Sequence, residues 1–430
     1  MAEHHALSRR ELMRGAVAAL TTAAAAARTS PLLAQPPATR TPIGPLAPGV
    51  LPAGIRSRFV ENVNGIRVHV LEAGYDSANR PGVLLVHGFP ELAFSWRRVM
   101  PRLAAAGFHV IAPDLRGYGR TDGTDVKFDD DLSPFRTLNR VLDMTALVSA
   151  FGYRSLAAIV GHDVGSGVAA WSSVVRPDIF RATVLMSAPF GGTPALPFNT
   201  ADQPRRAPAA DSGPGNDDIY DQLAKLTPPR KHYQRYYSTR EANDNMWHAR
   251  QGLQAFIRAY YHMKSADWKQ NKPGPLKART AEEWAKLPRY YVMDLDKGMA
   301  EQVASEMPSA SEIAGNKWLP DSDLRVYAEE YGRTGFQGGL QSYRVGSSGR
   351  FNAELGMFAG RTIDQPSMFI AGRSDWGAFQ APGSLERMQQ SACTHMQGVH
   401  LLEGAGHWVQ QEQADQVSTL ILDFLKRNHV

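Results

Sequence analysis

The sequence predicts an α/β protein in which a mostly parallel sheet, flanked by helices, is interrupted by a long helical insertion. Short, continuous apolar runs are typical of strands buried on both faces of a parallel sheet, and they occur at 83–86, 110–112 and 156–160. This pattern stops near residue 190 and returns at about Pro366, and the sequence between is aromatic and charged. The 430 residues, 43% of them hydrophobic, suffice for a full core and an inserted domain.

The remaining elements are predicted from periodicity. Residues 66–71 alternate between apolar and polar side chains, which predicts a half-buried edge strand. Residues 137–151 have helical spacing, and further strands are predicted at 182–187 and 367–372. Within the insertion, helical spacing is clearest at 252–263.

Asp163 lies in the most informative segment, Gly161-His162-Asp163-Val164-Gly165. The segment has the G-x-S-x-G spacing of a nucleophile elbow, with an aspartate in place of the serine. Small residues on both sides permit a sharp turn from strand to helix. A carboxylate needs no base to activate it, and it attacks saturated carbon to leave an ester on the enzyme. The alternative is a buried or capping aspartate between two glycines.

A turn after the strand at 83–86 carries the second chemical signal, His87-Gly88-Phe89-Pro90. A backbone N–H group from such a loop supplies half of an oxyanion hole, and the residue after the nucleophile supplies the other half. The predicted donors are therefore the amides of Phe89 and Val164. The alternative is an ordinary Gly-Pro turn after a core strand.

An acid and a histidine follow the elbow in chain order. The strand at 367–372 runs into Asp375, and a strand ending at Leu402 runs into a glycine-rich loop that presents His407. The order nucleophile, acid, histidine favours a catalytic triad over a surface histidine. Asp364 is the competing acid, but it precedes its strand and would lie at the wrong end of the sheet.

Four motifs in combination resemble the epoxide hydrolase branch of the α/β-hydrolases: Asp163 in its Gly-His-Asp turn, the turn at 87–90, Asp-Leu-Arg-Gly-Tyr-Gly at 114–119 and Gly-Ala-Gly-His ending at His407. The resemblance covers roughly residues 57–430. It implies an α/β-hydrolase core with an inserted helical lid. The implied segments are the first half of the core at 57–190, the lid at 191–350 and the second half of the core at 351–430.

The resemblance also implies two lid tyrosines over the nucleophile. The segment Gly-Phe-Gln-Gly-Gly-Leu-Gln-Ser-Tyr-Arg places Tyr343 in one of these roles. The segment His-Tyr-Gln-Arg-Tyr-Tyr points to Tyr233 for the other, with Tyr236, Tyr237 and His232 as neighbouring alternatives.

In the implied reaction, Asp163 attacks an epoxide carbon while Tyr233 and Tyr343 hold and protonate the oxygen. His407, oriented by Asp375, then activates a water molecule that hydrolyses the ester to give a vicinal diol. The expected partner is a small-molecule epoxide, and neither a metal nor an organic cofactor is required.

Two other functions compete with this interpretation. A dehalogenase on the same scaffold would share the nucleophile, acid and base, but halide binding needs N–H donors that the Val164 side chain does not offer. A catalytically silent binding protein would keep the fold without turnover. The net charge of +5 includes no Lys/Arg block, so nucleic acid is not an expected partner, and the single cysteine, Cys393, excludes an internal disulfide.

The N-terminus has a separate pattern. Ser8-Arg9-Arg10 precedes a weakly apolar, alanine-rich run, which predicts a twin-arginine export signal at 1–34 and a periplasmic or secreted protein. The run is too short and too weakly apolar for stable membrane insertion. The alternative is a basic tail on a cytosolic enzyme. Residues 35–56 are rich in proline and are predicted to be a linker.

Overall fold

The computed structural model of the protein describes residues 43–47, 49–77, 79–196 and 218–430. Within it, Pro45–Val430 form one compact unit, which contains the sheet, its flanking helices and the lid. The predicted export signal at 1–34 lies outside the described residues, as do part of the predicted linker and residues 197–217 of the predicted lid.

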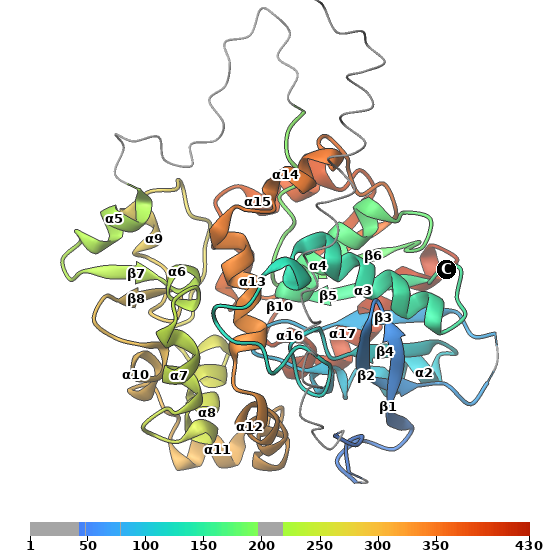
Figure 1. The fold of residues 1–430 in the computed structure, drawn as a ribbon, viewed down its shortest axis with the longest axis horizontal. Helices are drawn as coiled ribbons and strands as arrows, with labels where there is room; N and C mark the ends of the chain where they lie inside the picture. Colours follow the sequence, from blue (N-terminus) through green and yellow to red (C-terminus); the bar gives the residue numbers. More distant parts are fainter. Residues whose placement is uncertain (1–42, 48, 78, 197–217) are drawn as a thin grey trace, which may run out of the picture. The chain divides into compact units, whose positions relative to one another are not determined.

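An eight-stranded sheet forms the core of this unit, in the spatial order β1-β2-β4-β3-β5-β6-β9-β10 (Figure 1). Strand β2 is antiparallel to both of its neighbours, and every pair from β4 to β10 is parallel. The predicted α/β class with a mostly parallel sheet is therefore confirmed. The strands are β1 (Ile55–Val63), β2 (Ile66–Ala73), β3 (Gly82–Val86), β4 (His109–Pro113), β5 (Ala158–His162), β6 (Thr183–Met186), β9 (Ser367–Gly372) and β10 (Met396–Leu402).

The prediction of an edge strand at 66–71 is wrong, because β2 is paired on both sides. The edge is instead β1, which begins at Ile55, inside the predicted linker. The alternation in β2 reflects a polar residue that is buried rather than exposed. His69 is 2% exposed, and its Nδ1 lies 2.7 Å from Asp114 Oδ2. A buried polar contact therefore produced the sequence pattern of a solvent-facing position.

Helices cover both faces of the sheet. Successive residues of a strand point to opposite faces, so Leu84 and Leu85 of β3 belong to two different hydrophobic clusters. Leu85 packs with residues of α2 (Met100–Ala105) and α17 (Ala414–Arg427). Leu84 packs in the cluster that contains residues of α3 (Thr137–Ala150), α4 (Val164–Val175) and the lid.

The lid is inserted between β6 and β9 and is mostly helical, with a two-stranded antiparallel ribbon that periodicity did not reveal (Figure 1). Its phenols bind the backbone just after β3. Tyr261 Oη donates to the Pro90 carbonyl at 2.9 Å, and Tyr331 Oη donates to the Glu91 carbonyl at 3.1 Å. The lid elements are α5 (Ile219–Ala224), β7 (Arg230–His232), α6 (Tyr233–Tyr237), α7 (Glu241–Trp247), α8 (Leu253–Lys264), α9 (Ala281–Trp284), β8 (Val292–Asp294), α10 (Met299–Ala304), α11 (Ala310–Gly315), α12 (Asp321–Thr334) and α13 (Gln337–Ser348).

Candidate active site

Asp163 occupies a strained turn between β5 and α4. Its φ of 53° lies in the left-handed region, which residues with a side chain rarely adopt. Three glycines leave room for the turn. A Cβ on Gly161 would lie 2.0 Å from the Gly165 carbonyl oxygen, one on Gly165 would lie 2.3 Å from the Val86 carbonyl oxygen, and one on Gly88 would lie 2.4 Å from Asp163 Cβ. The elbow therefore requires glycine at all three positions.

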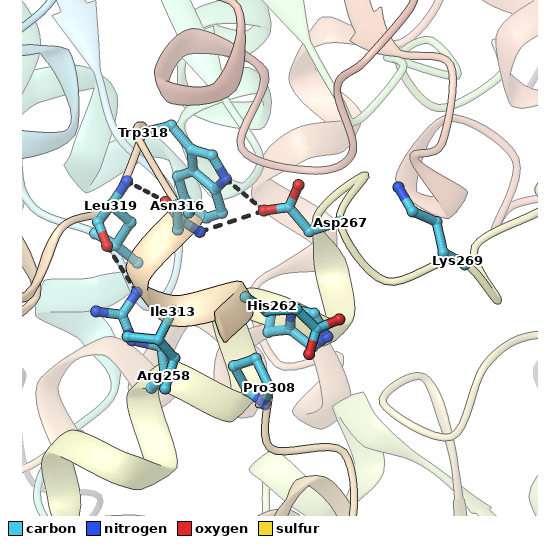
Figure 2. Close-up of a pocket in the computed structure, with 11 residues that line it drawn as sticks. Arg258, His262, Asp267, Lys269, Pro308, Ile313, Asn316, Trp318 and Leu319 are labelled. Carbon is cyan, nitrogen blue, oxygen red and sulfur yellow. Dashed lines mark hydrogen bonds between the residues drawn. The ribbon is translucent and has the colours of Figure 1, made fainter. Parts of the chain in front are cut away.

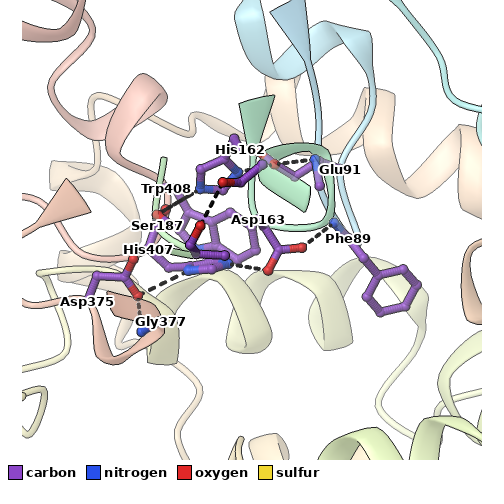
Figure 3. A network of polar contacts seen from close by, with 12 residues as sticks. Phe89, Glu91, His162, Asp163, Ser187, Asp375, Gly377, His407 and Trp408 are labelled. Carbon is purple, nitrogen blue, oxygen red and sulfur yellow. Dashed lines mark hydrogen bonds and ion pairs between the residues drawn. The ribbon is translucent and has the colours of Figure 1, made fainter. Parts of the chain in front are cut away.

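The structure brings Asp163, His407 and Asp375 together beyond the carboxyl ends of parallel strands (Figure 3). His407 Nε2 lies 3.3 Å from Asp163 Oδ2, and His407 Nδ1 lies 3.1 Å from Asp375 Oδ1. The Gly377 amide donates to Asp375 Oδ1 at 2.7 Å and fixes the acid. An Nδ1–H group that donates to Asp375 leaves Nε2 free to accept a proton. The competing acid Asp364 precedes β9, at the opposite end of the strand.

The Phe89 amide lies at the Asp163 carboxylate. It donates to Asp163 Oδ1 at 2.9 Å, whereas Oδ2 faces His407 (Figure 3). Val164 is the first residue of α4, so its amide belongs to a helical turn whose N–H groups have no acceptor within the helix. Both amides come from segments that border the same carboxylate.

Burial and charge act in opposite directions on the Asp163 carboxyl. Burial alone would raise its pKa, but His407, Lys264 and His162 together hold the pKa well below its usual range. Asp375 has the same balance, because burial raises its pKa while His407 and hydrogen bonds from Ser187 and Gly377 together lower the pKa below its usual value. Asp163 is therefore ionised at neutral pH, as a carboxylate nucleophile must be.

The two predicted lid tyrosines lie near this carboxylate. Tyr343 packs against the Phe89 ring at a centroid separation of 5.4 Å and against Tyr233 at 6.0 Å. Burial raises the pKa of both phenols well above the usual value, and the negative charge of Asp163 raises each further. Both side chains are therefore protonated donors. Tyr233 Oη donates to Gln380 Oε1 at 3.2 Å.

The neighbouring alternatives are engaged elsewhere. Tyr236 Oη donates to Asn245 Oδ1 at 2.8 Å, and Tyr237 Oη donates to Tyr260 Oη at 3.1 Å. Burial lowers the pKa of His232 to about 3, so this imidazole is neutral and is no acid at neutral pH. Tyr233 Oη also has a partner, Gln380, so the choice of Tyr233 as the second donor stays a prediction.

Comparisons with known proteins agree with this geometry. A family model described as the alpha/beta hydrolase fold matches residues 81–414. The chain belongs to the α/β-hydrolase family. An epoxide hydrolase of Caballeronia sordidicola is 29% identical to this α/β-hydrolase over 368 residues, covering 84% of this chain and 92% of the relative. Epoxide hydrolase A of Mycobacterium tuberculosis is 30% identical over 386 residues, covering 86% and 98%. The solved structure of an epoxide hydrolase from an endophytic Streptomyces has a TM-score of 0.66 at 29% identity, covering 87% and 96%.

A buried ion pair lies next to the active site of this α/β-hydrolase, and it was not predicted from the sequence. Glu91 and His162 are fully buried, and Glu91 Oε2 lies 2.5 Å from His162 Nδ1 (Figure 3). His162 Nε2 lies 2.7 Å from the His407 carbonyl oxygen. Burial would lower the pKa of His162, but Glu91 raises it above its usual value. Both residues adjoin predicted motifs, since Glu91 follows the turn at 87–90 and His162 precedes Asp163, and that adjacency was the available signal.

Glu412 is a second residue that sequence reasoning missed. Its Oε2 accepts hydrogen bonds from the Ala266 amide at 2.8 Å and the Gly406 amide at 3.0 Å, and its Oε1 accepts one from the Trp408 amide at 3.0 Å. Burial raises the pKa of Glu412 to about 8, and the three amides oppose that shift. No local motif indicates that Glu412 binds these amides, because Ala266 lies far in the chain from Gly406 and Trp408.

A pocket in the lid is lined by residues of α8 and α11 and of the segments that follow them (Figure 2). Its polar groups largely bind one another: Asp267 Oδ2 accepts a hydrogen bond from Trp318 Nε1 at 2.9 Å, and Arg258 donates to the Leu319 carbonyl at 2.6 Å. None of the predicted site residues lines it. Within the described ranges, no group of three or more His, Cys, Asp and Glu side chains is arranged to hold a metal ion. The helices of those ranges also include none with the length and apolarity needed to cross a membrane.

Proposed function

We propose that the protein hydrolyses epoxides to vicinal diols through a covalent ester on Asp163. The observation that carries the proposal is an ionised aspartate at the elbow, in contact with a His–Asp pair on one oxygen and a backbone amide on the other. The curated relatives are epoxide hydrolases, which supports a small-molecule epoxide as the substrate.

The first step forms the ester. An Asp163 oxygen attacks one epoxide carbon, the carbon–oxygen bond of the ring breaks, and its electron pair moves to the departing oxygen. Tyr233 or Tyr343 donates a proton to that oxygen. Their O–H groups bind it more strongly as its charge grows, which lowers the barrier selectively.

The second step breaks the ester. His407 takes a proton from water through Nε2, and Asp375 stabilises the resulting imidazolium. The hydroxide adds to the Asp163 carbonyl carbon, and the amides of Phe89 and Val164 stabilise the oxyanion. Collapse of this intermediate breaks the ester carbon–oxygen bond, and the departing diol oxygen takes the proton held by His407. The acid proton left on Asp163 returns to the tyrosine that protonated the epoxide oxygen. The diol then leaves and the carboxylate is restored, now carrying one oxygen from water.

The tyrosines favour an epoxide over a haloalkane. An alkoxide leaving group needs a proton, which a phenol supplies, whereas a halide ion needs none. The side chain directly after Asp163 is that of Val164, which has no N–H group to bind a halide. A catalytically silent protein has no use for an ionised carboxylate held in a strained turn.

Twin-arginine export to the periplasm or the medium is part of the proposal. It is supported by Ser8-Arg9-Arg10 followed by a weakly apolar run. That route carries folded proteins and does not require disulfides, which agrees with Cys393 as the single cysteine.

A single turnover in water labelled with heavy oxygen tests the mechanism. The label should enter the Asp163 carboxylate and be absent from the first diol released. Label in that diol would mean direct hydration and would reject the ester. His407→Gln should accumulate the alkylated enzyme, which mass spectrometry detects, and Asp163→Ala should accumulate none.

A further inference from the structure

Lys264, the last residue of α8, is a buried cation within the lid. Only 2% of the surface of Lys264 is exposed. The ammonium lies 5.0 Å from the ring centroid of Tyr291, 5.3 Å from that of Tyr260, 5.4 Å from that of Trp408 and 5.8 Å from that of Tyr290. Aromatic faces attract a cation, so the four rings replace part of its lost hydration.

The ammonium has no acceptor in the described part of the chain. None of the ion pairs and hydrogen bonds found among the described residues involves Lys264 Nζ. Tyr291 Oη is also buried without a hydrogen-bond partner among the same residues. An unpartnered buried polar group is costly, and a bound ligand is one explanation for it.

Both donors lie close to the reacting groups. The Tyr291 and Tyr233 ring centroids are 5.0 Å apart, which places Lys264 Nζ at most about 10 Å from the Tyr233 ring. Burial raises the pKa of Tyr291 well above its usual value, and the charges of Asp375 and Asp163 raise it further. The positive charge of Lys264 in turn helps to lower the pKa of Asp163.

We propose that Lys264 and Tyr291 form a subsite for a carboxylate on the substrate, so that the preferred epoxides are short epoxy acids. This inference rests on the proposed function and adds the substrate class. A carboxylate supplies acceptors to both the ammonium and the phenol, and the charge-assisted bonds are the stronger kind. The separation from Tyr233 is spanned by a substrate with a few carbon atoms between its epoxide and its carboxylate.

Matched substrates test the subsite. A six-carbon terminal epoxide that ends in a carboxylate is compared with the same compound ending in a primary amide, by kcat/KM at constant ionic strength. The wild type should prefer the carboxylate. Lys264→Met should lower the carboxylate-to-amide ratio by about tenfold to a hundredfold, the range expected for a hydrogen bond to a charged group. Lys272→Met, an exposed lysine of the same lid segment, should leave the ratio unchanged.

A wild-type enzyme without preference would overturn the proposal, as would a Lys264→Met variant that loses equal activity on both substrates. The second result would mean that Lys264 acts through Asp163 alone. Lys264→Gln replaces the methionine variant if circular dichroism shows that the latter is unfolded.

Binding of unreactive hexanoate and hexanamide, measured by calorimetry, separates the subsite from the chemistry. Hexanoate should bind the wild type more tightly than hexanamide, and Lys264→Met should abolish the difference. If no epoxide is turned over but this difference is found, the proposed function fails and the subsite stands. If epoxides are turned over and the difference is missing, the subsite fails and the function stands.

Discussion

Glu412 holds the loop of His407 through the amides on either side of that residue. Its carboxyl oxygens accept hydrogen bonds from Gly406 and Trp408, and also from Ala266 just after α8 in the lid. The amide of His407 itself donates to the Lys264 carbonyl at 2.7 Å. The lid and the general base are thus joined by direct backbone contacts, so the position of His407 depends on that of α8.

Glu412→Gln should slow ester hydrolysis more than ester formation. The glutamine keeps the size of the side chain but has one acceptor oxygen instead of two, which loosens one side of the loop. Small misplacements of a catalytic group cost up to about a hundredfold in rate, so we expect a tenfold to hundredfold slower second step. Rapid-quench single turnovers resolve the two steps.

The control for this variant is Glu403→Gln, which removes only a surface ion pair with Arg373. It should leave both steps unchanged. Equal slowing of both steps in Glu412→Gln would assign Glu412 a purely structural role, and an unchanged pH profile of the hydrolytic step would also contradict its action through His407.

Tyr343→Phe should slow ester formation with little change in folding, because it removes one hydroxyl and keeps the ring. Loss of one such donor elsewhere costs about a hundredfold to a thousandfold, and the second phenol should soften that loss. The double variant Tyr233→Phe/Tyr343→Phe should lose far more than either single variant. Near wild-type rates in the double variant would exclude both tyrosines as proton donors. Tyr236→Phe is the matched control.

The ion pair of Glu91 and His162 should stabilise the fold in a limited pH window. The pKa of Glu91 is lowered, so its contribution is present above the unfolded value of about 4.3 and is lost as pH falls through the folded value. The pKa of His162 is raised, so its contribution is complete below about 6.5 and is lost as pH rises through the folded value.

Removing one partner of this pair should therefore lower the free energy of unfolding most near pH 5 to 6. Removing one partner of a buried pair costs about 3–5 kcal/mol, and we expect Glu91→Gln to lower the free energy of unfolding by that amount. Urea denaturation across pH measures the difference from the wild type, which should shrink towards alkaline pH. A difference that stays constant with pH would show that packing, not charge, is lost.

The arginine pair near the N-terminus should direct export. Arg9→Lys/Arg10→Lys should keep the protein in the cytoplasm, folded and active, because the export receptor reads the arginines. Cell fractionation with activity assays measures the location. Normal export of this variant, or failure of a protein lacking residues 1–34 to fold, would contradict the assignment.

The sequence alone determined that the sheet is mostly parallel, and it identified Asp163, Asp375 and His407 as a candidate triad. These signals are local. Apolar runs identify buried strands, glycines around Asp163 identify the turn, and the carboxyl ends of parallel strands meet at one edge of the sheet. Chain order therefore sufficed to predict which side chains lie together.

Only the tertiary structure decided the rest. The polar residue in β2 predicted an exposed face, but Asp114 from a distant loop pairs with His69 and buries it. Tyr236 and Tyr237 donate to partners on other lid helices, which no local pattern indicates. Lys264 and Glu412 have no motif, because burial and long-range contacts define their surroundings. Periodicity reports local preference, whereas pairing and burial depend on segments that are far apart in the chain.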